Sequence, residues 1–93
     1  MNKVKHNHQP SDARFRYRYI HVCRDAQLDT WEGKPIWYIF NNRTSEALGR
    51  ILWYKPWKRW IAQFDESSIW STDCLVCVSD ALDRLARQEK DPH

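Results

Sequence analysis

Apolar and polar residues alternate with a period of two near the start of the chain. From Phe15 to Tyr19 the aromatic residues fall on one side, and Arg16 and Arg18 fall on the other. A period of two is typical of a strand that is buried on one face only. The segment over residues 15–22 is therefore predicted to be a strand.

Three further runs are rich in aromatic and β-branched residues, as strands are. They cover residues 36–40, 49–54 and 57–64. Pro56 separates the last two runs and fits the second position of a tight turn, so these two strands are predicted to form a hairpin. Residues 69–70 are a candidate for a short fifth strand. The segment over 23–35 is expected to be a loop, closed by Gly33 and Pro35.

The last part of the chain has the periodicity of a helix. Aliphatic residues recur at spacings of three and four, which gives a stripe facing the core. The stripe comprises Leu75, Val78, Leu82 and Leu85. Ser71 or Thr72 can cap the helix, because both hydroxyls accept hydrogen bonds from free backbone N–H groups.

These elements predict an α+β fold: a four- or five-stranded antiparallel sheet meander, with one C-terminal helix packed on one face. Residues 1–13 are polar and are interpreted as a disordered N-terminal arm. Residues 14–90 are expected to form a single domain, and residues 91–93 a frayed C-terminus. His6 and His8 lie in the arm, where solvation is the simplest interpretation.

Composition adds an excess of rings to this picture. The 93 residues include six Trp, four Tyr and three Phe, more than a small core needs, so some rings are expected at the surface. The net charge of +3 permits an acidic partner without requiring one. Three Cys are too few for a disulfide scaffold, and we find no apolar stretch of membrane length and no signal region. A cytoplasmic location without membrane contact is expected.

The richest functional signal is the segment over residues 54–60. It combines three cations with three rings: Tyr54, Lys55, Trp57, Lys58, Arg59 and Trp60. Arg50 precedes it, and Arg16 and Arg18 are expected on a nearby strand. Nucleic-acid surfaces use cations for phosphate and flat rings for bases. The competing interpretation is that the tryptophans are core and hairpin pairs, with the cations as a solvated rim.

Trp57 and Trp60 are three residues apart. Side chains that alternate along a strand cannot place both on one face. At least one of them is therefore expected to be exposed or in a second cluster, unless the strand is bulged.

The chain offers little chemistry for catalysis. It contains no phosphate-binding glycine loop, no nucleophile elbow and no zinc-protease helix. Cys74 and Cys77 form a CxxC at the predicted helix start, but their apolar spacer favours buried thiols over redox chemistry. With His21 and Cys23 they would form a four-ligand zinc set, although neither pair has the glycine typical of a zinc knuckle. We expect no enzyme activity, no metal and no cofactor.

A resemblance extends over residues 37–85. The sequence resembles a family of short, uncharacterised bacterial and prophage-type proteins through NRTS at 42–45, LGRILWY at 48–54, WKRW at 57–60, and Cys74 with Leu75. The resemblance implies a bacterial or phage origin and a role in mobile-element biology, including inhibition of host defence. The predicted architecture is also similar to AP2-type and integrase-arm DNA-binding domains.

The expected function is that of a small non-enzymatic binding module that contacts nucleic acid. The expected contact residues are Arg16, Arg18, Arg50, Tyr54, Lys55, Trp57, Lys58, Arg59 and Trp60. The alternative is a phage-type protein-binding module that inhibits or adapts a nucleic-acid-handling protein, with the same rings as anchors. The partner's identity and the oligomeric state stay open at this stage.

Overall fold

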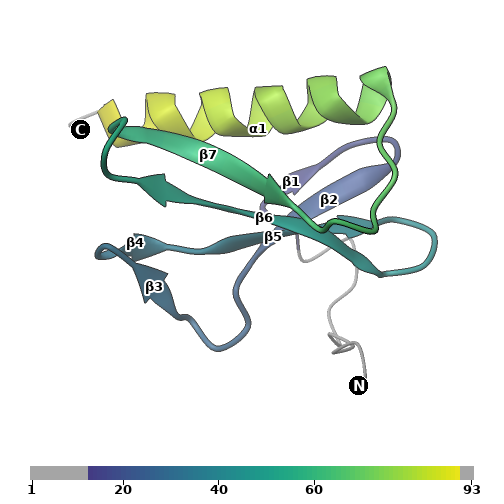
Figure 1. The fold of residues 1–93 in the computed structure, drawn as a ribbon, viewed down its shortest axis with the longest axis horizontal. Coiled ribbons are helices and arrows are strands. Elements are labelled where there is room, and N and C mark those ends of the chain that lie inside the picture. Colours follow the sequence, from purple (N-terminus) through teal and green to yellow (C-terminus); the bar gives the residue numbers. More distant parts are fainter. Residues whose placement is uncertain (1–12, 91–93) are drawn as a thin grey trace.

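The computed structural model describes residues 13–90, and it has a main antiparallel sheet crossed by one helix (Figure 1). The expected arm therefore lies outside the described residues except for Ala13, as does the expected frayed end over 91–93. The sheet has five strands in the order β1-β2-β5-β6-β7. They are β1 (Phe15–Arg16), β2 (Ile20–Arg24), β5 (Trp37–Asn41), β6 (Ala47–Tyr54) and β7 (Arg59–Phe64). With α1 (Thr72–Lys90), this arrangement confirms the predicted α+β meander.

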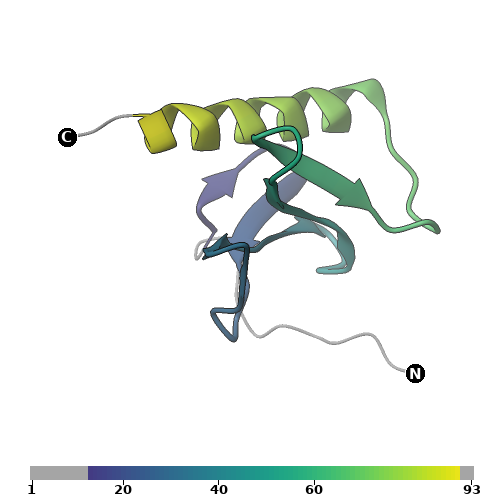
Figure 2. The same ribbon diagram turned by 60° about the vertical axis from the view of Figure 1, so that its left-hand side comes forward.

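The main core lies between α1 and one face of the sheet, as both ribbon views show (Figures 1 and 2). Val22 pairs with Ile39 across β2 and β5, and Ile51 follows on β6; all three side chains are fully buried. On the helix, Val78 and Leu85 are buried as predicted. Burying side chains of this size contributes about 1.5–3 kcal/mol each before conformational entropy is subtracted.

The prediction that Leu75 belongs to the core-facing stripe of the helix is wrong. Leu75 is 43% exposed, whereas Ala81, which lies outside the predicted stripe, is fully buried. The stripe is centred on Val78, Ala81 and Leu85, so its next position toward the N-terminus is Cys74, four residues before Val78. Leu75 is turned to the side of the contact.

The opposite face of the sheet, called the far face below, is also largely buried at its centre. His21, Phe40 and Leu52 are each at most 3% exposed. His21 stacks on the Phe40 ring, and its Nδ1 lies 2.7 Å from Oδ1 of Asn42. The sheet therefore has buried side chains on both of its faces.

The predicted single strand over 15–22 is wrong, because the chain turns at 17–19. The backbone N–H of Tyr17 donates to the carbonyl of Ile20 at 2.9 Å, which separates β1 from β2. The side-chain amide of Asn42 donates to the carbonyls of Tyr17 and Arg18 at 2.8 and 3.0 Å. Alternation alone misses this turn because its anchor, Asn42, lies more than twenty residues further along the chain.

The predicted loop over 23–35 contains a small hairpin. Its strands are β3 (Thr30–Trp31) and β4 (Lys34–Pro35). The two residues between them, Glu32 and Gly33, have φ of 53° and 78°. Positive φ at both positions is the geometry of the two-residue turn that favours right-twisted hairpins. Strands of two residues are too short to leave an alternation signal.

The connection into the helix is irregular, so the candidate strand over residues 69–70 does not form. Trp70 instead packs on Phe64, with ring centroids 4.3 Å apart. The helix begins where the sequence predicts: the Ser71 hydroxyl accepts from the backbone N–H of Cys74 at 3.2 Å. Over residues 13–90, no helix combines the length and the apolar character needed to cross a membrane.

Replacement of Leu85 should test the helix packing directly. We expect Leu85→Ala to lower the free energy of unfolding by ~2–5 kcal/mol, because it empties a buried site between helix and sheet. Leu75→Ala is the matched control, and it should change stability by less than about 0.5 kcal/mol. Urea denaturation followed by circular dichroism measures both. Equal effects of the two substitutions would contradict the helix orientation.

Candidate functional site

The β6–β7 hairpin is the longest pairing in the sheet and ends in a four-residue turn. Tyr54 and Arg59 form its last cross-strand pair. In the turn, the N–H of Lys58 donates to the carbonyl of Lys55 at 3.1 Å, which places Pro56 at the second turn position, as the sequence predicts. Lys58 has a φ of 52°, and this left-handed conformation lets the chain re-enter β7.

The two tryptophans of this hairpin have opposite environments. Trp60 is 7% exposed and packs edge-on against Trp53, with ring centroids 5.7 Å apart. Trp57 is 66% exposed and meets the Tyr54 ring edge-on, at 5.0 Å. The expectation that at least one of Trp57 and Trp60 is exposed is therefore confirmed.

The small β3–β4 hairpin lies at the same end of the molecule as the 55–58 turn, as Figures 1 and 2 show. The two hairpins touch, since the ammonium of Lys34 lies 5.0 Å from the centre of the Trp53 ring. Trp31, which pairs with Lys34 across β3 and β4, is 49% exposed. Cation–π contact of this kind stabilises by about 0.5–1 kcal/mol at exposed sites.

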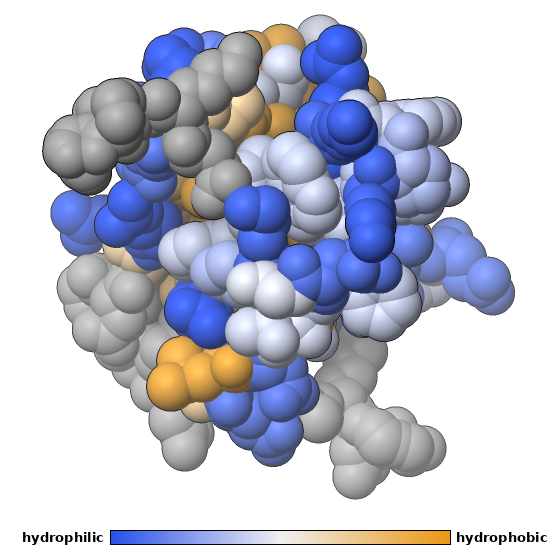
Figure 3. Space-filling view, turned by 90° about the vertical axis from the view of Figure 1, so that its left-hand side faces the viewer, coloured by the Kyte–Doolittle hydropathy of each residue, from blue (hydrophilic) through white to orange (hydrophobic). Residues whose placement is uncertain are grey.

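Together the hairpins form a surface that we call the basic-aromatic end. It comprises Trp31, Lys34, Trp53, Tyr54, Lys55, Trp57, Lys58 and Arg59. Figure 3 faces this end, and it shows strongly hydrophilic groups interleaved with the pale colours to which Trp and Tyr belong. Strongly apolar groups are few on this side, so the rings stand among cations and polar groups.

Three of these residues, Trp53, Trp31 and Lys34, are absent from the contact set that the sequence predicts. Trp31 and Lys34 fall in the segment expected to be a loop. The signal that could have found them is the pair Glu32-Gly33 between an aromatic and a cationic residue, since such a pair can close a two-residue hairpin.

The structure does not bring all the expected contact residues together. Arg18 lies in the turn before β2, and the pairing of Ile20 with Asn41 places that turn near the start of β6. The 55–58 turn follows the end of β6, roughly 20 Å away for a strand of this length. Arg16, on β1 opposite His21, is likewise remote.

Arg50 lies in a third location. It is on the far face of β6, where its Nε donates to the side-chain oxygen of Gln63 at 2.8 Å. It borders a shallow hollow on this face. The nine predicted contact residues thus divide among the basic-aromatic end, the hollow on the far face and the distant β1–β2 hairpin, with Trp60 in the core.

The candidate zinc ligands are also separated. His21 and Cys23 are on the far face, whereas Cys74 and Cys77 pack against the core on the helix side. Among residues 13–90, no group of three or more metal-binding side chains is present. The pKa of the Cys77 thiol is raised above its usual value, first by burial and then by the nearby Cys74 and Asp73. A raised pKa lowers the thiolate fraction, which disfavours nucleophilic chemistry at the CxxC.

Alkylation should reveal the effect of burial on the Cys77 thiol. We expect iodoacetamide at about pH 8 to modify Cys77 more slowly in the folded protein than in denaturant, because its raised pKa leaves less of the thiol as thiolate. Tandem mass spectrometry after timed quenching locates the modified residue. Equal or faster modification of Cys77 in the folded protein would show that its environment favours the thiolate.

Truncation of the two tryptophans should have unequal effects on stability. Trp60→Ala should lower the free energy of unfolding by ~3–5 kcal/mol, because Trp60 fills the core beside Trp53. Trp57→Ala should change it by about 0.5 kcal/mol or less, because the ring is mostly solvated. Thermal and urea denaturation of both variants measure the difference. Similar destabilisation by both substitutions would show that Trp57 is part of the core.

Comparisons with known proteins give no relative from which a role could be transferred. No protein-family model matches the chain, and no significant match was found among curated proteins or among solved structures. The case for function therefore depends on the chemistry of the residues themselves.

Proposed function

We propose that the protein is a small binding module that holds single-stranded nucleic acid on its basic-aromatic end. The observation that carries the proposal is Trp57, a large ring left 66% exposed at the tip of the paired β6–β7 hairpin. Lys55, Lys58 and Arg59 surround it in the chain and are exposed as well. An exposed ring with cations on both sides matches what a base and its flanking phosphates require.

The hairpin can present these groups without first having to become ordered. Its register is fixed below the tip by the packed pair of Trp53 and Trp60. A pre-organised surface loses less side-chain and backbone entropy on binding than a flexible one. Stacking of one base on an aromatic ring contributes about 1–3 kcal/mol, so Trp57 and Trp31 together can supply useful affinity.

Single strands are favoured over duplexes by the kind of side chain exposed. Trp57 and Trp31 offer flat aromatic faces but few hydrogen-bond donors. An aromatic face can stack on a base only when that base is not stacked within a duplex. Lys34, Lys55 and Lys58 add charges that do not depend on sequence. We therefore infer weak sequence preference at this end, and an affinity that falls as salt rises.

The alternative is a protein-binding module of the phage type that inhibits or adapts a nucleic-acid-handling protein. Exposed apolar side chains near the 65–71 connection favour it: Ile69 is 91% exposed, and Phe64 and Leu75 are each 43% exposed. Exposed apolar groups of this kind can serve as interface anchors. Such a partner would still bind after nuclease treatment.

Removal of two cations from the tip should weaken binding of nucleic acid. We expect Lys58→Ala with Arg59→Ala to lower the affinity for a labelled oligothymidylate of about 15 nucleotides, measured by fluorescence anisotropy across a salt series. The slope of log affinity against log salt should become shallower by about 0.7 for each phosphate that the variant no longer neutralises. The double variant Arg16→Ala with Arg18→Ala is the matched control, because it removes the same charge from the distant end.

Equal reductions of affinity in the two double variants would contradict a localised site, and the absence of binding by the wild type would overturn the proposal. Lys58→Gly separates binding from folding. It removes the cation while allowing the left-handed backbone that Lys58 adopts, so stability should be kept while affinity falls.

A further inference from the structure

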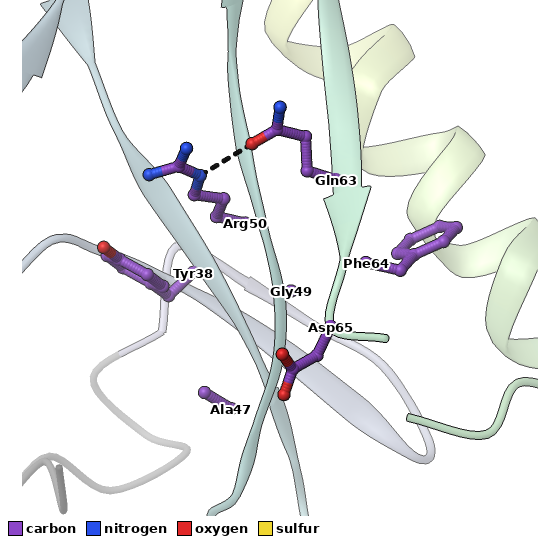
Figure 4. Close-up of a pocket in the computed structure, with 7 residues that line it drawn as sticks. All are labelled: Tyr38, Ala47, Gly49, Arg50, Gln63, Phe64 and Asp65. Atoms are coloured by element: carbon purple, nitrogen blue, oxygen red, sulfur yellow. Dashed lines mark hydrogen bonds between the residues drawn. The ribbon is translucent and has the colours of Figure 1, made fainter. Parts of the chain in front are cut away.

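The far face of β6 and β7 continues from the basic-aromatic end into a shallow hollow of about 270 Å³ (Figure 4). The hollow is lined by Tyr38, Ala47, Gly49, Arg50, Gln63, Phe64 and Asp65. It therefore involves three neighbouring strands, together with the first residue after β7. Its lining includes both charge signs and a flat ring.

The floor of the hollow is formed by Ala47, a small side chain of β6, and by the strand at Gly49. Ala47 and Gly49 lie beside a register shift between Ile39 and Phe40 of β5, where β6 has an extra residue. A Cβ added to Gly49 would lie 2.5 Å from the carbonyl oxygen of Gln63, so glycine is required by the close approach of β7. The small Ala47 beside the larger Tyr38 leaves the depression, whereas the Phe64 ring points away from it toward the helix, where it packs on Trp70.

The polar groups around the hollow are held in defined places. The bond from Arg50 Nε to Gln63 orients the guanidinium and leaves its two terminal nitrogens as potential donors to a ligand. In Figure 4 the Asp65 carboxylate lies on the opposite side of the hollow from that pair, and the Tyr38 ring lies at a third side. A ligand here would meet a cationic donor, an anionic acceptor and an aromatic ring.

A continuous strip of β7 joins this hollow to the basic-aromatic end. Arg59, Ile61 and Gln63 alternate along β7 on the far face, opposite Tyr54, Leu52 and Arg50 of β6. Arg59 and Gln63 are exposed, and Ile61 is half-buried. The distance from Arg59 to Gln63 is roughly 13 Å along a strand, which an extended nucleic-acid strand of a few nucleotides can span.

We propose that the hollow binds one nucleobase bearing an exocyclic amino group, from the same strand that the basic-aromatic end holds. This inference rests on the proposed function. The ring would contact Tyr38, and its amino group would donate to the Asp65 carboxylate, as cytosine donates from N4 to acidic side chains. The adjoining phosphate would lie toward Arg50, away from the negative charge of Asp65.

The pairing with Asp65 gives a specificity that the stacking end lacks. Thymine and uracil present a carbonyl where cytosine presents an amino group, so they would place an acceptor against a carboxylate. Two acceptors cannot form a hydrogen bond and repel each other. The expected preference is therefore for cytosine over thymine at one position of the bound strand.

Anisotropy titrations with matched oligodeoxycytidylate and oligothymidylate of about 15 nucleotides, near pH 7.5, test this inference. The wild type should bind the cytosine strand about fivefold more tightly, as one added hydrogen bond of ~1 kcal/mol would give. Ala47→Leu should fill the hollow and abolish the preference. Asp65→Ala should abolish it too, and, because Asp65 is exposed, this variant keeps the test valid if the leucine disturbs folding.

The outcomes separate the two proposals. If the wild type binds neither strand, both the proposed function and the role of the hollow are overturned. If binding depends on Lys58 and Arg59 but shows no cytosine preference, or keeps its preference in Asp65→Ala, the proposed function stands and the role of the hollow is overturned. Disappearance of the preference in both hollow variants, with thymidylate binding retained, supports the assignment.

Discussion

The edge-on packing of Trp60 against Trp53 is the contact on which the candidate site depends. It lies on the helix side of the sheet, just below the last pair of the β6–β7 hairpin. By burying Trp60 it fixes which side of β7 faces the core, and the four-residue turn then leaves Trp57 outside. The same Trp53 ring receives Lys34 from the second hairpin, so one buried contact organises both parts of the basic-aromatic end.

The rest of the domain supports this arrangement through its two-sided sheet. Helix α1 covers one face through Val78, Ala81 and Leu85, while His21 and Phe40 are buried on the other. The pairing of β6 with β7 continues up to Tyr54 and Arg59, so the turn that carries Trp57 begins directly at the end of the paired strands. Exposed tryptophans on a small domain are otherwise unfavourable, and their grouping among cations is the reason to assign them to binding.

Much of the fold follows from short-range patterns in the sequence, and the errors have a common cause. The hairpin around Pro56, the cap at Ser71 and the exposure of one of two tryptophans follow from local spacing and turn chemistry. The turn at 17–19 depends instead on Asn42, a residue remote in sequence, and the β3–β4 hairpin is too short for periodicity to detect. For the candidate site, local spacing predicted an exposed ring beside the turn at Pro56, but it could not show that Arg18 lies at the opposite end or that Trp31 lies at the same end as Trp57.

The central claim is that nucleic acid contacts the two exposed hairpin tryptophans and leaves the buried one undisturbed. The most direct measurement is a nuclear magnetic resonance titration of the ¹⁵N-labelled protein with oligothymidylate, followed at the indole N–H signals. The account predicts that the signals of Trp57 and Trp31 shift progressively to saturation, while the signal of Trp60 shifts little. Unchanged indole signals throughout the titration would contradict it, and so would shifts confined to the indole signal of Trp70, which is next to Ile69.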